Sequence, residues 1–208
     1  MVAAPNRINP VSRLNILKVL MLLILSLLMF SSYALAESPK DQLQKTIDSI
    51  IEVLKTIRSP EDIERNRGSL RQLLLTRFDF VAMAQRSLGN RWTDLKGNQQ
   101  ELVSVFTEFV EHGYMSTLGS YRGEKVVYDH DRVDGESAEV DTRVVGGAGA
   151  PIKIGYKLHL AGREWMVYDA VIDDVSVVAN YRSQFARILY RSSLEELIEA
   201  LRAKASGG

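Results

Sequence analysis

Helical spacing of apolar side chains dominates the first half of the chain after its N-terminal hydrophobic segment. Ser38-Pro39 is typical of an N-cap followed by the first helical residue, and apolar residues then recur every three or four positions as far as Ile57. A second helix is predicted from Ser59-Pro60, with Asp62 placed as a capping-box acid. We expect Gly68 to interrupt this second helix.

Two more helices are predicted before the pattern changes. Residues 78–88 fit a short helix that ends at Gly89, because glycine suits the left-handed position after a helix. Residues 97–121 give the longest helical pattern, and its apolar stripe is wider than one surface contact requires. We therefore expect this long helix to be central.

From Gly123 onward the apolar residues recur at every second position, which is the period of a strand. Short turn signals such as Asp134-Gly135 separate the runs and favour an antiparallel meander. The predicted strands are residues 124–130, 137–145, 151–160 and 164–172. In the third strand one set of alternate residues is apolar and the other polar, so one face meets the interior and the other meets water.

Helical spacing returns over residues 175–190, and a capping box at Ser193–Glu196 opens a last helix. The order of elements predicts an α+β fold with a helical layer packed on a twisted four-stranded antiparallel sheet. No linker or repeat divides this single domain, which we place at residues 37–208.

Residues 1–36 predict a cleaved signal peptide. They contain three basic and no acidic residues, a 12-residue apolar run at 19–30, and the sequence Ala34-Leu35-Ala36 before the expected cleavage point. A permanent anchor is disfavoured, since a bilayer core needs roughly 20 apolar residues. Removing the segment takes away three of 26 basic and none of 26 acidic residues, which leaves a net charge of −3. A chain so close to neutral has no broad basic surface for nucleic acid.

Candidate chemistry is sparse. The chain has no cysteine, and no nucleophile or phosphate-binding motif occurs in it. Asp129-His130-Asp131 resembles a metal cluster, but in a regular strand His130 would point away from both aspartates. We predict a solvated strand end there, no metal and no cofactor.

The nearest acid–base candidates are Tyr168-Asp169 and Tyr181-Arg182. We favour a structural role, in which Asp169 and Arg182 form a partly buried ion pair that clamps the following helix to the sheet. The apolar stripes of helix and sheet allow two interpretations. They form an ordinary closed core, or they part to leave an apolar cavity for a lipid, which needs no reactive group.

Three stretches of sequence resemble one family. They are FDFVAMAQRSLGNRW (78–92), FTEFVEHGYMSTL (106–118) and EWMVYDAVIDDVSVVANYRSQF (164–185). Together with the signal peptide, they resemble the MlaC-like periplasmic phospholipid-binding component of the Mla, or toluene-tolerance, ABC transport system. The resemblance covers nearly the whole mature chain. Many relatives carry glycine where this chain has Asp174, which alters a turn and a surface charge.

The resemblance implies a periplasmic lipid carrier that is not an enzyme. Its partners would be phospholipid, an inner-membrane ABC transporter with an MCE-domain protein, and an outer-membrane lipoprotein–porin complex. Acyl chains would lie between the helices and the sheet, with the headgroup largely exposed. We assign the pocket to inward residues of the long helix and the sheet, for each of which ordinary core packing is the alternative. They are Phe106, Phe109, Val110, Tyr114, Val140, Ile154, Tyr156, Leu158, Trp165 and Val167.

Three other functions remain open at this point. A related branch handles hopanoids, so the ligand could be another lipid. A small cone-shaped α+β hydrolase or isomerase would use Asp169 with Tyr168 or His159, and would need a polar, titratable cavity. A protein-binding adaptor would have a filled core and an exposed apolar patch.

Overall fold

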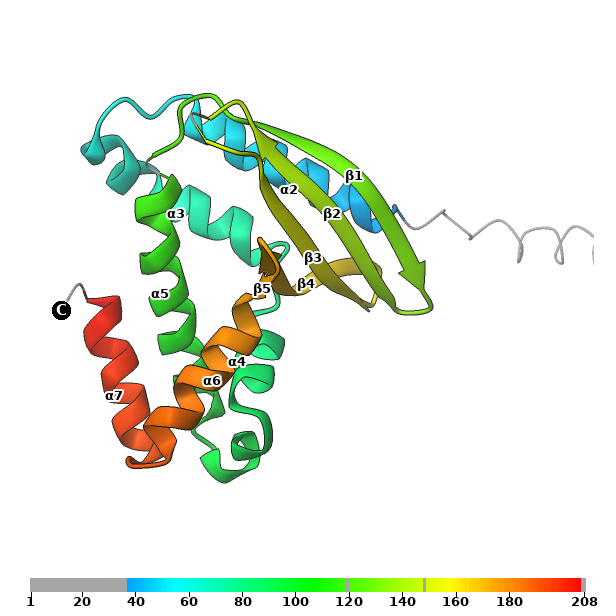
Figure 1. Ribbon diagram of the computed structural model, residues 1–208. Coiled ribbons are helices and arrows are strands. Elements are labelled where there is room, and N and C mark those ends of the chain that lie inside the picture. The colour runs from blue at the N-terminus through cyan, green and yellow to red at the C-terminus, as the bar shows by residue number, and fades with distance from the viewer. Residues whose placement is uncertain (1–36, 119, 148, 207–208) are drawn as a thin grey trace, which may run out of the picture. The chain divides into compact units, whose positions relative to one another are not determined.

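The computed structural model describes residues 37–118, 120–147 and 149–206, without the side chains of residues 115–117. From Ser38 onward these residues belong to one compact unit (Figure 1). The predicted signal peptide, residues 1–36, lies outside the described residues and stays a prediction. No described helix is long and apolar enough to cross a membrane.

The first two helices begin where their caps predict. Helix α2 (Pro39–Leu54) is capped by the Ser38 hydroxyl, which accepts a hydrogen bond from the Asp41 amide at 3.0 Å. Helix α3 (Pro60–Leu75) has the capping box of Ser59 and Asp62. The break predicted at Gly68 is wrong, because α3 continues through it. One glycine costs a helix only about 1 kcal/mol, and the buried Leu70 two residues later anchors that turn.

Helix α4 (Phe80–Leu88) starts two residues later than predicted. Phe78 instead forms an isolated parallel bridge with Val167, in which the Val167 amide donates to Arg77 O and the Asp79 amide donates to Val167 O. Gly89 has the positive φ of 56° expected after a helix, and it starts the 3-10 helix η1 (Gly89–Leu95). Helix α5 (Gln99–Leu118) is the long helix.

The predicted α+β class is confirmed, with one more strand than expected. Strands β1 (Lys125–Asp134), β2 (Ser137–Val145), β3 (Ile152–Ala161), β4 (Glu164–Ile172) and β5 (Val175–Ser176) pair antiparallel in sequence order. The two-residue β5 follows a tight turn at Asp173 and Asp174, both with positive φ. Helices α6 (Val177–Leu189) and α7 (Leu194–Ala205) complete the chain, with α6 packed on α4 and α7 on α5 (Figure 1).

Buried apolar residues form three separate clusters. The helix-side cluster belongs to α4–α7 and η1, the sheet-side cluster joins α2 to β2–β4, and the third cluster joins α2 to α3. The helix-side cluster contains Phe80, Met83, Ala84, Leu88, Leu95, Leu102, Val105, Phe106, Val110, Val177, Val178, Phe185, Leu194, Leu197, Ile198 and Leu201. The sheet-side cluster contains Leu43, Ala138, Val140, Leu158, Trp165 and Val167. The third cluster contains Ile50, Leu54 and Leu70.

A buried arginine ties the first helix to the sheet. The Arg77 guanidinium donates to Gln42 Oε1 at 2.6 Å, to Trp165 O at 2.7 Å and to Thr46 Oγ1 at 3.3 Å. Gln42 Oε1 also accepts from the Trp165 amide at 2.9 Å. A buried cation needs such partners, so this network fixes α2 over β4.

Candidate functional site

Nine of the ten residues predicted to line a lipid pocket lie in or against two of the apolar clusters. Phe106 and Val110 are in the helix-side cluster, and Phe109 and Tyr114 pack against it. The sheet-side cluster contains Val140, Leu158, Trp165 and Val167, and Tyr156 packs against it. Ile154 belongs to neither cluster. The predicted set therefore forms two apolar walls, one of helices and one of sheet and α2.

Exposure separates the residues that support these walls from those with surface left for a ligand. Phe106, Val140, Leu158 and Val167 are 0% exposed, so protein atoms already fill their surroundings. The half-buried candidates are Phe109, Tyr114, Ile154 and Tyr156. Side chains of this second kind still have apolar surface that an acyl chain could cover.

The ring of Phe78, a residue outside the predicted pocket set, packs against both walls. Its backbone is held on β4 by the bridge to Val167. It stands in the FDF block that carries the family resemblance, so that block was the available signal. Its position before the start of α4 could not be predicted from helical spacing, because the spacing continues through residue 78.

Half-buried tyrosines stand on both walls. Burial raises the pKa of Tyr156 to about 12 and that of Tyr181 to about 12. Burial, with the charge of Asp169, raises the pKa of Tyr114 as well. The buried Tyr128 hydroxyl has no hydrogen-bond partner in the described part of the chain. These phenols are neutral at physiological pH, which suits an apolar site rather than acid–base chemistry.

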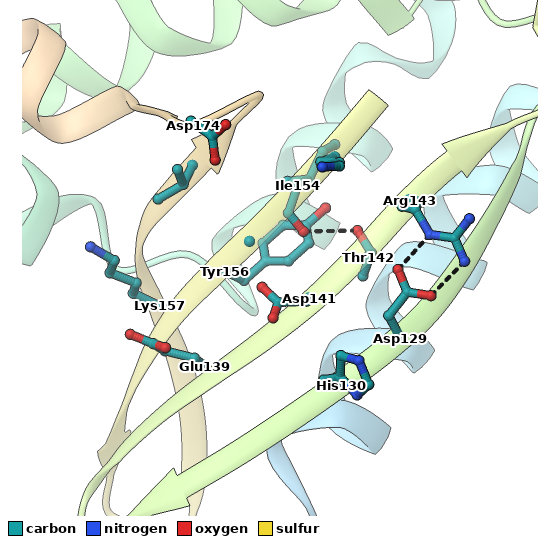
Figure 2. Close-up of a pocket in the computed structure, with 13 residues that line it drawn as sticks. Asp129, His130, Glu139, Asp141, Thr142, Arg143, Ile154, Tyr156, Lys157 and Asp174 are labelled. Atoms are coloured by element: carbon teal, nitrogen blue, oxygen red, sulfur yellow. Dashed lines mark hydrogen bonds and ion pairs between the residues drawn. The ribbon is translucent and has the colours of Figure 1, made fainter. Parts of the chain in front are cut away.

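A first hollow of about 680 Å³ lies over β1–β4 (Figure 2). Charged and polar side chains from β1, β2, β3 and the β4–β5 turn line most of it, beside Ile154, Tyr156 and Val171. Asp129 accepts two hydrogen bonds from Arg143, at 2.6 and 2.7 Å (Figure 2). So polar a lining does not suit acyl chains.

The expected geometry of Asp129-His130-Asp131 is wrong. A β-bulge between Tyr128 and His130 leaves Asp129 without an opposite residue, and the pairing resumes at His130 with Asp141. Asp129 and His130 consequently line the same hollow instead of pointing apart (Figure 2). Within the described residues, no group of three or more metal-ligating side chains forms.

Asp169 pins α6 to the sheet, but not through the predicted partner. Its buried carboxylate accepts hydrogen bonds from Ser176 Oγ at 2.7 Å and from the Val178 amide at 3.0 Å. Lys157 Nζ lies 4.0 Å away. The ion pair predicted with Arg182 is wrong, because Asp169 binds the N-terminus of α6, one helical turn earlier. The exposed Arg182 instead lies against Gly89, where an added Cβ would stand 2.8 Å from its guanidinium.

In the hydrolase alternative, the His159 and Tyr168 rings pack edge to face with their centres 5.9 Å apart, but the polar groups of the three residues have different partners. His159 Nε2 lies 2.9 Å from Asp79 Oδ2, and Asp79 also caps α4. The Arg86 guanidinium lies 4.1 Å from the centre of the Tyr168 ring. Asp169 is engaged by the α6 N-terminus. Their hydrogen bonds thus serve caps and packing, and do not join them into an acid–base set.

A second hollow, of about 600 Å³, lies between the α2–α3 connection and the α5–β1 connection. Its wall includes Leu54, Ile57, Ile63, Leu118 and Tyr121, and its charged lining residues are Arg58 and Arg122. No local sequence pattern predicts this hollow, because it joins two loops about 60 residues apart.

The MlaC protein family model matches residues 44–203, from within α2 to within α7, and so covers the whole sheet and both hollows.

The chain belongs to the MlaC family.

Individual relatives agree with this assignment to the MlaC family. The chain is 24% identical over 192 residues to the intermembrane phospholipid transport system binding protein MlaC of Haemophilus influenzae, covering 88% of this chain and 90% of the relative. It is 27% identical over 94 residues to toluene tolerance protein ttg2D of Pseudomonas putida, covering 45% and 44%.

A solved structure shares the fold of this MlaC family member. It is a phospholipid-binding protein from Ralstonia solanacearum in complex with a phospholipid. The TM-score is 0.72 at 22% sequence identity, and the match covers 82% of this chain and 98% of the other.

Proposed function

We propose that this protein binds phospholipid by its acyl chains and carries it through the periplasm without catalysing a reaction. The observation that carries the proposal is the placement of nine predicted residues on two apolar walls that meet at Phe78. Membership of the MlaC family supports it, as do the names of the relatives in Haemophilus influenzae and Ralstonia solanacearum.

The half-buried candidates supply the proposed contact surface. Phe109 and Tyr114 present it from α5, and Tyr156, which packs against the sheet-side cluster, presents it from β3. Covering an acyl chain contributes about 0.8 kcal/mol per methylene group. The proposed slot between the two walls therefore holds lipid without any reactive or strongly polar group.

The family resemblance supports a shuttle role. We propose that residues 1–36 direct export to the periplasm and that residues 37–208 form the carrier. It would exchange phospholipid between an outer-membrane lipoprotein–porin complex and an inner-membrane ABC transporter with an MCE-domain protein, and so help maintain outer-membrane lipid asymmetry.

Mass spectrometry of an organic extract of the native protein tests the lipid. We expect bound phospholipid, and we expect the emptied protein to take up phospholipid from vesicles. A hopanoid in the extract would assign another lipid class. A protein that is empty and takes up no lipid would refute carriage.

A pair of α5 variants tests the position of the slot. Tyr114→Glu places a charge on the proposed contact surface, whereas His112→Glu places the same charge on the exposed side of the same helix. We expect the first variant to lose phospholipid uptake and the second to retain it, with circular dichroism confirming that both are folded. Equal uptake by both folded variants would exclude Tyr114 from the slot.

A further inference from the structure

The second hollow has an apolar wall that continues the proposed lipid-facing side of α5. Tyr114 and Leu118 are four residues apart on α5, so they lie along one side at its C-terminal end. Tyr121 follows the helix; its amide donates to Leu118 O at 3.1 Å, and both residues line the hollow. Leu118 and Tyr121 pack against the third cluster, whose Leu54 also lines the hollow. An apolar chain that leaves the slot along α5 would reach this wall next.

The charged residues that line the hollow are both arginines, and no carboxylate is among the lining residues. Arg58 Nη1 donates to Lys55 O at 2.5 Å and to Ile57 O at 2.9 Å, so the end of α2 holds its guanidinium in place. Arg58 forms no ion pair within the described part of the chain. Arg122 Nη1 donates to Tyr121 O at 2.8 Å.

The nearby acid Asp62 does not neutralise Arg58 at its guanidinium. The Asp62 carboxylate accepts from the backbone amides of Arg58 at 2.8 Å and Ser59 at 3.0 Å, and it pairs with Arg65. The Asp62 charge therefore interacts with the N-terminus of α3 and with Arg65, and not with the Arg58 guanidinium. The hollow combines an apolar wall with guanidinium groups that bind phosphate oxygens through paired N–H donors.

We propose that this hollow binds the phosphate end of the phospholipid, with the first part of the acyl chains against Ile57, Leu118 and Tyr121. This inference rests on the proposed function and adds headgroup recognition to it. The ligand class is a phosphate-bearing amphiphile. A purely polar anion would leave the apolar wall uncovered, and a lipid without phosphate would leave the Arg58 guanidinium without an anion.

Paired arginine variants test this role. Arg58→Gln with Arg122→Gln removes both charges, and Arg91→Gln with Arg187→Gln removes two exposed charges that do not line the hollow. Uptake is measured from vesicles that contain phosphatidylglycerol and, separately, diacylglycerol with the same chains. We expect the first double variant to lose at least tenfold in phosphatidylglycerol affinity and to keep its diacylglycerol affinity. The control variant should match wild type for both lipids.

The outcomes separate this inference from lipid carriage. If wild type takes up phosphatidylglycerol and the Arg58/Arg122 variant takes up as much, headgroup recognition is refuted while carriage stands. If wild type takes up neither lipid, both are refuted. Competition by inorganic phosphate alone at the affinity of the lipid would make the hollow a free-anion site and overturn the lipid assignment.

A reporter variant tests the position of the lipid without removing an arginine. Tyr121→Trp places an indole on the wall of the hollow, and the folded parent protein with Trp92 and Trp165 serves as its background. Phospholipid brominated near the glycerol should quench the added fluorescence more than phospholipid brominated near the methyl ends. The opposite order would overturn the proposed orientation.

Discussion

Replacing Asp169 by alanine tests how α6 is attached to the sheet. The change removes the acceptor of two hydrogen bonds, from Ser176 Oγ at 2.7 Å and from the Val178 amide at 3.0 Å. It also removes a negative charge at the N-terminus of a helix, where such a charge is favourable. Both donors would be left without their acceptor beside a buried position.

The expected loss in the free energy of unfolding is about 2–4 kcal/mol. Hydrogen bonds to a charged group contribute about 1.5–3 kcal/mol each, and part of this sum is offset because the mutant no longer buries a carboxylate. For a domain of this size, each kcal/mol shifts Tm by about 2–4 °C. Urea unfolding followed by circular dichroism gives the free energy, and a thermal scan gives Tm.

A double-mutant cycle isolates the contact. Asp169→Ala and Ser176→Ala should be coupled by about 1–2 kcal/mol. Arg182→Gln, which breaks no ion pair among the described residues, should cost less than about 1 kcal/mol. If Arg182→Gln cost as much as Asp169→Ala, and Ser176→Ala cost nothing, the assignment of the α6 N-terminus as the partner of Asp169 would be refuted.

Three further substitutions test other features. Tyr128→Phe removes a buried hydroxyl without a hydrogen-bond partner in the described chain, so its free energy of unfolding in urea should lie within about 0.5 kcal/mol of wild type or above it. A loss above about 1.5 kcal/mol would contradict this expectation. Glu111 on α5 is buried and pairs with Arg71, whose Nη1 lies 2.6 Å from Glu111 Oε2. Burial outweighs this pair and raises the pKa of Glu111 from 4.5, so the folded state binds its proton more tightly. The free energy of unfolding of wild type minus that of Glu111→Gln should therefore fall as pH rises above 4.5. A difference that does not change with pH would contradict this prediction. Asp174→Gly should raise Tm or leave it unchanged, since φ is +68° there, and a lower Tm would indicate a stabilising side-chain contact.

Local signals made most of the fold predictable. Strands β2 and β4 have the predicted limits because their alternation is regular and turns bound them on both sides. Features that break a local period were missed. The bulge at Asp129 reverses the face of His130, and the bridge at Phe78 takes that residue out of its helix. Both depend on pairing with a distant strand, which no local pattern encodes.

The sequence predicted which residues of the candidate site are apolar and inward, but not which side chains contact one another. Alternation and helical spacing identified the apolar walls, because inward residues must be apolar. The partner of Asp169 was misassigned, since order along the chain does not reveal that the α6 amides lie closer than the Arg182 side chain. The second hollow requires the α2–α3 and α5–β1 connections to meet, and this follows only from the packing of α5 beside α3.

The network around Arg77 constrains the order in which the chain can fold. It joins Gln42, in the first described helix, to Trp165, 123 residues later in the fourth strand. Contacts of such long sequence separation slow folding, because a large loop must close before they form. A chain synthesised from its N-terminus therefore makes α2 first and docks it late. Until β4 has formed, Gln42 and Leu43 lack the sheet that buries them, so truncation before Trp165 leaves α2 with an uncovered apolar face.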